Sequence, residues 1–83
     1  MRLRILYFAW FRERVGVPGE EVETEAETVS ALIGQLRASS ERHGQAFSHM
    51  AGIRVAVDQK VCPLDASLEG ASEVAFFPPM TGG

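Results

Sequence analysis

Alternating apolar and polar positions near the start of the chain predict a β-strand. In residues 2–10, RLRILYFAW, the side chains of Leu3, Ile5 and Tyr7 fall on one face of an extended segment, and Phe8 falls on the other. The aromatic and β-branched residues of this stretch favour a strand. Its length indicates a central position in a sheet.

A turn and a second strand follow. Residues 16–19, GVPG, combine glycine and proline in the way that marks turns. In residues 20–26, EEVETEA, Val22 and Thr24 could point one way while the glutamates point the other. Two strands joined by a short turn predict an antiparallel hairpin.

The next stretch has the apolar period of an amphipathic helix. Thr28 is suited to cap its first turn, because a threonine side chain accepts a hydrogen bond from a free backbone N–H. The helix then presents one apolar stripe, which consists of Val29, Leu32, Ile33 and Leu36. The serines and glycine of residues 39–44 indicate that it ends there. Residues 45–52 are ambiguous, and Phe47 and Met50 could form a short turn that plugs the end of the core.

Three further strands complete the predicted fold. Residues 53–57, IRVAV, form one strand, and residues 60–62, KVC, pair back to it after a reversal at residues 58–59. The last strand, EVAFF at residues 73–77, ends at two prolines, which cannot donate ladder hydrogen bonds. This order predicts an α+β fold, a mixed sheet with one main helix packed on one face. The expected core consists of Leu3, Ile5, Tyr7, Leu32, Ile33, Leu36, Val55, Val74 and Phe76.

Composition and charge narrow the functions open to such a domain. The 83 residues allow one domain with a small core, and the hydrophobic content of 46% is typical of a folded protein. A net charge of −3 with scattered arginines disfavours nucleic-acid binding and favours a basic protein partner. A single cysteine, Cys62, excludes an internal disulfide, and no signal peptide or membrane span is recognisable. We therefore expect a cytoplasmic protein that binds neither nucleic acid nor membrane.

Few residues offer catalytic or metal-binding chemistry. His43 and His49 lack a cysteine or acid pair at metal-ligand spacing, so we interpret them as surface or partly buried histidines. Cys62 is better interpreted as a small core residue than as a persulfide-carrying thiol. A run of acidic residues predicts a solvated strand face, with a docking surface for a basic partner as the alternative. This run consists of Glu20, Glu21, Glu23, Glu25 and Glu27. The sequence predicts no metal site and no tightly bound cofactor.

The C-terminal segment differs from an ordinary chain end. Residues 78–83, PPMTGG, are expected to form a flexible tail beyond a domain of residues 1–77. The two prolines favour an extended path, which limits the entropy lost when the tail enters a partner. Gly82 and Gly83 lack Cβ atoms and so fit a narrow channel, and the extended tail would reach about 20 Å. The two glycines alone are equally compatible with a chain end that merely frays.

Three segments together resemble a known family. The ending EVAFFPPMTGG matches the C-terminal motif of the molybdopterin synthase small-subunit (MoaD) family of ubiquitin-like sulfur carriers. LYFAWFRERVG resembles the first strand of that family and the Arg-Glu pair after it, and VAVDQKV resembles its middle hairpin. Asp58 stands where an asparagine is common, and GQAFSHMAG matches no family pattern. The likeness covers most of the chain and implies a ubiquitin-like β-grasp fold.

The resemblance also implies a mechanism carried by the last residue. In this family, an adenylating enzyme related to ubiquitin-activating enzymes uses ATP to convert the terminal glycine into an acyl-adenylate, and a sulfur donor protein yields the thiocarboxylate. The tail then enters the large subunit of molybdopterin synthase, where the sulfur passes to a cyclic pyranopterin precursor. This builds the dithiolene that holds molybdenum or tungsten. By matching position, Gly83 would carry the sulfur and Gly82 would provide clearance, while the large subunit supplies the main catalytic residues.

The same resemblance implies a surface for the large subunit. Phe8, Val61 and Phe77 match positions at which the family's small subunit packs against the large one, and the spacer Pro78, Pro79, Met80 and Thr81 would follow into the partner. Large apolar patches on an outer sheet face mark interfaces. The alternative is that Phe8 or Phe77 simply completes the core. The implied assembly contains two small and two large subunits, with the large ones forming the central dimer.

Three other functions remain open from the sequence. A related sulfur carrier for thiamine or cysteine synthesis also ends in two glycines, although the FFPP spacer fits it less well. A ubiquitin-like modifier would form isopeptide bonds through Gly83. A plain interaction domain would carry an inert tail.

Overall fold

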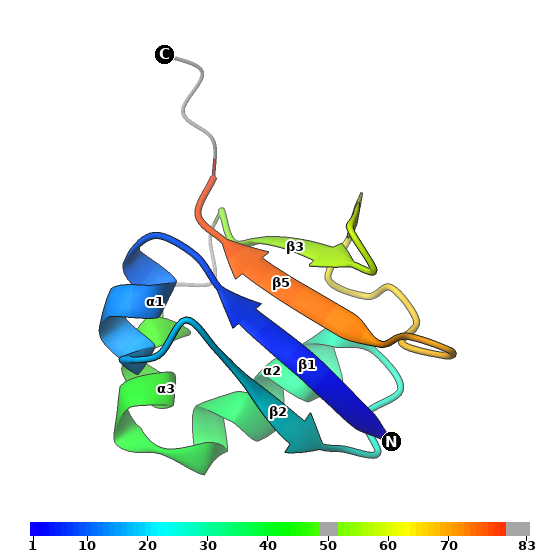
Figure 1. Ribbon diagram of the computed structural model, residues 1–83, viewed down its shortest axis with the longest axis horizontal. Helices are drawn as coiled ribbons and strands as arrows, with labels where there is room; N and C mark the ends of the chain where they lie inside the picture. The colour runs from blue at the N-terminus through cyan, green and yellow to red at the C-terminus, as the bar shows by residue number, and fades with distance from the viewer. Residues whose placement is uncertain (49–51, 80–83) are drawn as a thin grey trace.

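A mixed five-stranded sheet forms the centre of the fold in the computed structural model, which describes residues 1–48 and 52–79 (Figure 1). The first and last strands lie side by side in its middle and run parallel, whereas the other neighbouring strands are antiparallel. Across the sheet the strands are β2 (Gly19–Glu23), β1 (Arg2–Tyr7), β5 (Glu73–Phe77), β3 (Arg54–Val57) and β4 (Lys60–Cys62). The predicted α+β fold with a mixed sheet is confirmed.

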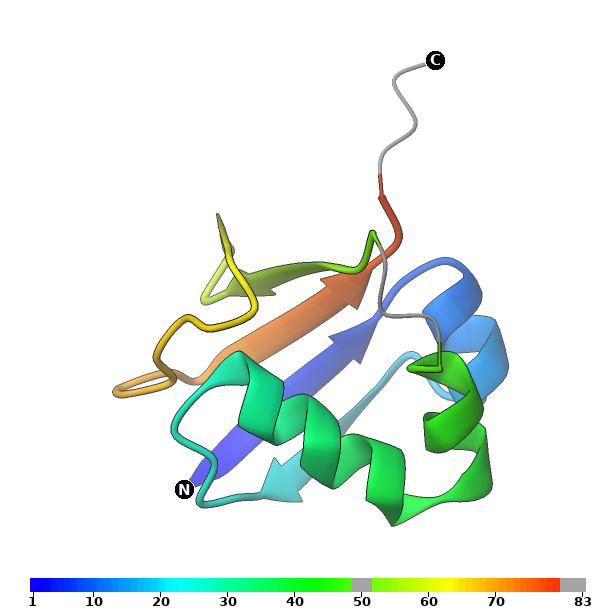
Figure 2. The same cartoon turned by 180° about the vertical axis from the view of Figure 1, so that it is seen from behind.

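The main helix covers one face of this sheet. Helix α2 (Val29–Ser39) begins after Thr28, whose side chain accepts a hydrogen bond from the backbone N–H of Ala31 at 3.2 Å, as the sequence predicted. Its predicted apolar stripe is buried. Figure 2 shows α2 in front of the strands, and Figure 1 shows that no described helix lies over the opposite face, here called the outer face. None of the described helices is long and apolar enough to span a membrane.

The connection between β1 and β2 contains a helix that the sequence pattern did not predict. The expected strand of residues 2–10 ends at Tyr7, and Ala9 has a positive φ of 52° that turns the chain into α1 (Trp10–Val15). Phe11 and Val15, four residues apart, bury one side of this helix. The expected hairpin with a short turn is therefore wrong in its connection, although its two strands pair as predicted.

A second short helix follows α2. Ser40 is extended and ends α2, and its hydroxyl caps α3 (Glu41–Ala46) by accepting a hydrogen bond from the backbone N–H of His43 at 3.1 Å. The main helix thus ends within the stretch predicted for its end, and α3 is a separate helix that the sequence did not predict. Phe47, directly after α3, is fully buried and plugs the core as expected, whereas Met50 lies outside the described residues.

All nine predicted core residues are buried, with exposed fractions of 2% or less. The structure adds an aromatic cluster at the end of the core nearest the C-terminus of β5. Within it the ring of Phe47 lies 5.0 Å from that of Phe76 and 5.3 Å from that of Phe11, between centroids. These rings hold α1 and α3 against the central strands.

The predicted reversal between β3 and β4 is confirmed at Asp58 and Gln59, which have positive φ angles of 49° and 71°. The Asp58 side chain joins this turn to the start of β5. Its Oδ1 atom accepts hydrogen bonds from the backbone N–H groups of Ser72 and Glu73, both at 3.0 Å. Asp58 therefore has a structural role, because it links the β3–β4 turn to the start of β5.

Candidate functional site

One row of small and apolar residues crosses the outer face from edge to edge. Residues paired directly across neighbouring strands point to the same face of a sheet. The strand register pairs Gly19 with Leu6, Leu6 with Ala75, Ala75 with Ala56, and Ala56 with Val61. None of these five residues, here called the outer row, is charged. Val61 at the β4 edge is 65% exposed.

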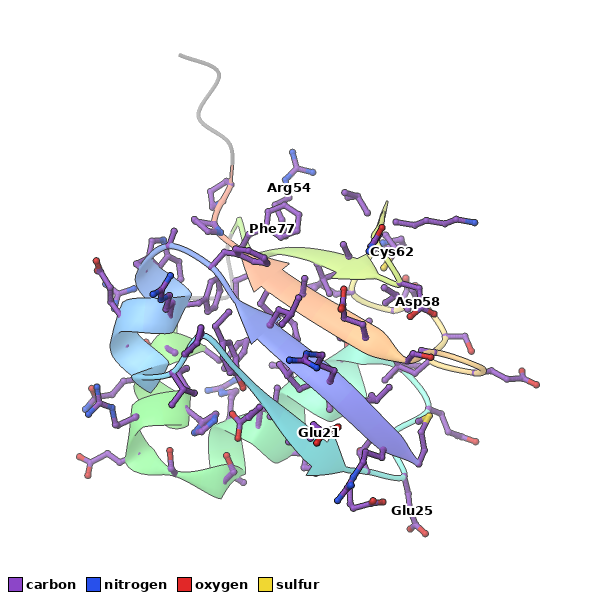
Figure 3. The ribbon with its side chains drawn as sticks, viewed as in Figure 1. Glu21, Glu25, Arg54, Asp58, Cys62 and Phe77 are labelled. Carbon is purple, nitrogen blue, oxygen red and sulfur yellow. The ribbon has the colours of Figure 1, made fainter. Side chains whose placement is uncertain are left out.

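The aromatic residues predicted for partner binding lie toward the C-terminal end of β5. Phe77 follows Ala75 on the same face of β5 and is half-buried opposite Arg54 on β3 (Figure 3). Phe8 is 49% exposed at the end of β1, where its backbone N–H donates to the carbonyl of Phe76 at 3.1 Å. Neither ring belongs to the buried core cluster, so the alternative that they complete the core does not hold.

Charged residues border the outer row on its other side. Arg4 on β1 stands between Glu21 on β2 and Glu73 on β5. One position further, the Arg2 guanidinium lies 3.3 Å from the carboxylate of Glu23. The apolar surface is therefore a bounded patch, and toward the tail it continues along β5 through Phe77, with Arg54 beside it on β3.

The tail begins directly beside this patch. Pro78 is half-buried and Pro79 is exposed. The predicted residues Met80, Thr81, Gly82 and Gly83 lie outside the described residues. Because Phe77 and Pro78 are consecutive, a partner that covers Phe77 also lies at the base of the tail.

Cys62 and His49 are among the other potentially reactive side chains. Cys62 is half-buried on β4 opposite Val55 and packs against the core, in keeping with the interpretation as a small core residue. Among residues 1–48 and 52–79, no group of three histidines, cysteines or carboxylates could hold a metal ion. His49 lies outside the described residues.

One glutamate of the acidic run faces inward, which corrects the expectation of a solvated face. The Oε2 atom of Glu20 accepts a hydrogen bond from the Tyr7 hydroxyl at 2.7 Å and lies 2.6 Å from Nε2 of His43. The Nδ1 atom of His43 lies 2.5 Å from the hydroxyl of Ser40. This polar cluster ties β1 and β2 to α3. Glu21, Glu23, Glu25 and Glu27 are exposed as predicted.

The environment of the polar cluster shifts two pKa values. Burial raises the pKa of Glu20, but the hydrogen bonds from His43 and Tyr7 outweigh it and leave this pKa below the ordinary value of 4.5. Burial, and then the adjacent Glu20 carboxylate, raise the pKa of Tyr7 far above its ordinary range. Tyr7 thus stays a neutral hydrogen-bond donor and Glu20 a charged acceptor near neutral pH.

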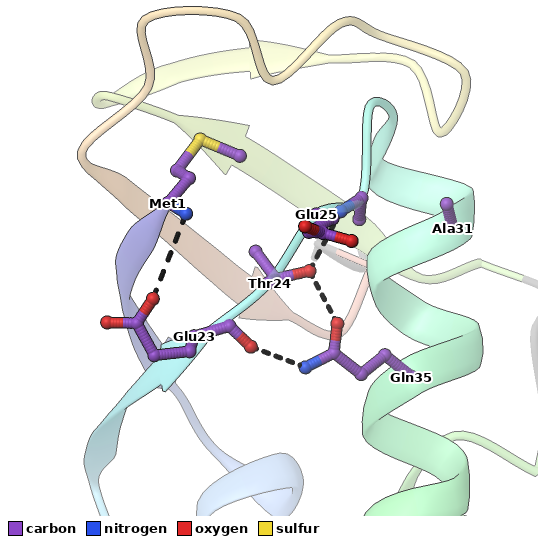
Figure 4. A pocket seen from close by; sticks show the side chains of 7 residues that line it. Met1, Glu23, Thr24, Glu25, Ala31 and Gln35 are labelled. Atoms are coloured by element: carbon purple, nitrogen blue, oxygen red, sulfur yellow. Dashed lines mark hydrogen bonds and ion pairs between the residues drawn. The ribbon is translucent and has the colours of Figure 1, made fainter.

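A surface hollow lies at the opposite end of the sheet from the tail (Figure 4). It has a volume of about 570 Å³ and is lined by Met1, Glu23, Thr24, Glu25, Ala26, Ala31 and Gln35. Its polar groups bond to one another: the Thr24 hydroxyl to Oε1 of Gln35 at 2.5 Å, and Nε2 of Gln35 to the Glu23 carbonyl at 2.9 Å. Nothing in this arrangement resembles a catalytic group.

Comparison with known proteins agrees with the resemblance seen in the sequence. Residues 5–83 match the ThiS family. The chain is 40% identical to the molybdopterin synthase sulfur carrier subunit of Escherichia coli (strain K12), over 98% of this chain and 99% of that protein. It is 34% identical to the molybdopterin synthase sulfur carrier subunit of Mycobacterium tuberculosis, over 100% of this chain and 99% of that protein.

Solved structures share the fold over nearly the whole chain. SAMP1 from Haloferax volcanii superposes with a TM-score of 0.76 at 22% identity, covering 100% of both chains. A putative molybdopterin converting factor, subunit 1, from Pyrococcus furiosus superposes with a TM-score of 0.73 at 27% identity, covering 96% of this chain and 99% of that one. The ubiquitin-like β-grasp fold is thereby shown, and the chain belongs to the ThiS family as a ubiquitin-like sulfur carrier of the molybdopterin synthase small-subunit type.

Proposed function

We propose that this chain is the sulfur carrier subunit of a molybdopterin synthase and that Gly83 carries the sulfur as a thiocarboxylate. The observation that carries this proposal is the bounded apolar patch of the outer row, Phe8 and Phe77 at the foot of a tail that ends in two glycines. The names of the relatives above supply the kind of assembly. The patch docks the domain, and the tail carries its end into the partner.

Activation is needed because a carboxylate does not release oxide. In the active site of a partner adenylating enzyme, the Gly83 carboxylate would attack the α-phosphorus of ATP. This step forms the acyl-adenylate and releases pyrophosphate. Hydrosulfide sulfur delivered by a donor protein would then add to the acyl carbon and displace AMP. The product is a thiocarboxylate in which one carboxylate oxygen has been replaced by sulfur. ATP is thus a substrate of the adenylating enzyme, and this chain needs no bound cofactor of its own.

Transfer would take place in the active site of the large subunit. The outer row and Phe77 would lie against that subunit, and the spacer of residues 78–81 would lead the two glycines inward. Because a glycine has no Cβ, Gly82 lets the backbone pass closely between partner side chains. The partner supplies the groups that deliver the sulfur to the pterin precursor. The assembly that we propose contains two copies of each subunit.

The other uses of a diglycine tail predict different products. A protein modifier would form an amide between Gly83 and a lysine of another protein. The likeness to SAMP1 does not favour that function, because structural similarity at 22% identity supports the fold alone. A carrier for thiamine or cysteine synthesis would make the same thiocarboxylate and deliver it elsewhere, so only the acceptor separates that function from ours.

Tandem mass spectrometry of the charged protein tests this proposal. Incubation with ATP, an adenylating enzyme and a sulfur donor should exchange one oxygen for sulfur, and fragmentation should place that change on Gly83. Adding the large subunit and the pterin precursor should return the carboxylate and form the dithiolene. Sulfur gained at Cys62 with no oxygen lost would contradict the proposal. So would a charged carrier that leaves the pterin precursor unchanged.

A further inference from the structure

The segment that enters β3 continues beside the first residues of the tail. Strands β3 and β5 are antiparallel, and their register pairs Arg54 with Phe77 at the end of the ladder. Continuing the same register by two residues places Gly52 opposite Pro79. The two prolines cannot extend the ladder by donating hydrogen bonds, because proline has no backbone N–H. Packing against the neighbouring segment can guide the tail beyond Phe77 without such bonds.

Such packing is present at Gly52. A Cβ atom built on this glycine would lie 3.0 Å from Cγ of Pro79, and 3.5 and 3.6 Å from its Cδ and Cβ atoms. The proline ring therefore lies directly over the bare Cα of Gly52. The neighbouring residue Ile53 is only 7% exposed and belongs to the core cluster. The surface beneath the proline ring is thus anchored in the fold.

Two independent features demand glycine at this position. Its φ of +82° lies in the left-handed region that residues with a Cβ rarely adopt. The Pro79 ring also occupies the space that a side chain would need. Gly70 has a similar φ of +74°, yet a Cβ there would meet no atom within 4 Å. A comparison of the two glycines therefore separates backbone strain from the loss of the proline contact.

We propose that Gly52 is a positioning residue that seats Pro79 and so sets the direction in which the tail leaves the domain. This inference rests on the proposed function, because direction matters only if the tail must deliver its end to a partner. A tail held at Pro79 has four residues beyond the contact, compared with six beyond Phe77, so holding it there lowers the entropy lost on insertion. Gly52 would act through Pro79 and would touch no reacting atom.

The contact itself is tested in the isolated protein, without any partner. Nuclear Overhauser cross-peaks are expected between the α-protons of Gly52 and the ring protons of Pro79 in the wild type and in Gly70→Ala. They should be lost in Gly52→Ala, while the thermal unfolding midpoints of the two alanine variants stay similar. Absence of these cross-peaks in the wild type would show that Pro79 does not pack on Gly52 and would overturn the inference.

The functional consequence is measured as single-turnover sulfur transfer from the thiocarboxylate to the pterin precursor on the large subunit. At saturating large subunit, Gly52→Ala should transfer sulfur about 10-fold more slowly than Gly70→Ala, because small displacements of a reacting group lower rates steeply. The affinity for the large subunit should fall by less than the transfer rate, since the outer row is untouched and only insertion of the tail is affected. In a Pro79→Ala background, Gly52→Ala should have little further effect, because the clash partner is gone.

Equal transfer rates for Gly52→Ala and Gly70→Ala would overturn the inference, and so would fully additive losses in the double variant. Failure of the proposed function looks different. In that case the wild type itself acquires no sulfur on Gly83. The cross-peaks between Gly52 and Pro79 persist and support the packing of Pro79 on Gly52 as a property of the fold.

Discussion

At the scale of single residues, Glu20 shows how a side chain from an exposed run becomes structural. Two of its neighbours come from distant parts of the sequence: Tyr7 from β1, and His43 from α3. Period-two alternation correctly placed Glu21, Glu23 and Glu25 outside, but it could not show that α3 would cover Glu20. That contact depends on the chain turning back after Ser40, which the local pattern does not encode.

The lowered pKa of Glu20 predicts a defined pH dependence of stability. Above the ordinary value of 4.5 the carboxylate is charged in both the folded and the unfolded protein, so its stabilising hydrogen bonds are fully present. As the pH falls from about 4.5 through the lower folded-state pKa, this contribution is lost. Glu20→Gln should therefore cost about 1–2 kcal/mol at pH 7 and progressively less toward pH 3.

Urea unfolding midpoints at pH 7, 5 and 3 measure this difference. Glu21→Gln is a matched control, because Glu21 is exposed and lies on the opposite face of β2 from Glu20, paired with Arg4. A constant difference between wild type and Glu20→Gln at all three pH values would show that the charge of Glu20 is not what the cluster uses.

At the scale of secondary-structure elements, long periodic segments were predictable and short helices were not. The stripe of α2 repeats over three turns, and the alternation of β1 matches its burial, whereas the three middle residues of β5 are all buried. Helix α1 has six residues, and its two buried positions, Phe11 and Val15, are too few to stand out beside the strand pattern that precedes them. Gly16 belongs to the GVPG motif that predicts a turn, and its left-handed conformation caps the end of α1.

The buried apolar stripe of helix α2 contributes to the stability of the domain. Leu36 is 1% exposed, so Leu36→Ala removes buried surface and leaves a cavity. We expect a loss of about 2–5 kcal/mol, which is a large share of the stability of a domain this small. Chemical denaturation measures it, with Arg37→Ala on the exposed side of the same turn as the control. An unchanged midpoint for Leu36→Ala would mean that α2 does not pack as described.

Half-buried Phe77 on β5 and exposed Phe8, directly after β1, should matter for association and not for folding. Truncating a central interface aromatic often costs about 2 kcal/mol or more of binding free energy. We expect Phe77→Ala, and to a smaller extent Phe8→Ala, to weaken binding to the large subunit while the unfolding midpoint stays near that of the wild type. Gln45→Ala, on the helical side of the molecule, serves as the control. Calorimetry that shows wild-type affinity for Phe77→Ala would remove Phe77 from the interface.

At the scale of the whole molecule, the two ends of the sheet differ in kind. The N-terminal end of β1 carries charged pairs and the hollow around Thr24, whereas the opposite end carries the exposed aromatic residues and the base of the tail. The sequence predicted the tail and its neighbouring aromatic residues, because they form one continuous motif. It could not predict the outer row, which takes one residue from each of five strands. Nor could it predict the packing of Pro79 on Gly52. Both depend on strand register.

The chain must end at residue 83 if its terminal carboxylate is the working group. Adding one residue after Gly83 moves the activated carbon and replaces the acid with an amide, and deleting Gly83 leaves the carboxylate one residue short. A misplacement of about 1 Å can cost about 100-fold in rate, so both variants should lose nearly all pterin-sulfurating activity. Their stability and their affinity for the large subunit should change little, because the docking patch lies on the strands. Full activity of the Gly83 deletion would show that a carboxylate one residue short serves equally well, and would refute the proposal that Gly83 is the working residue.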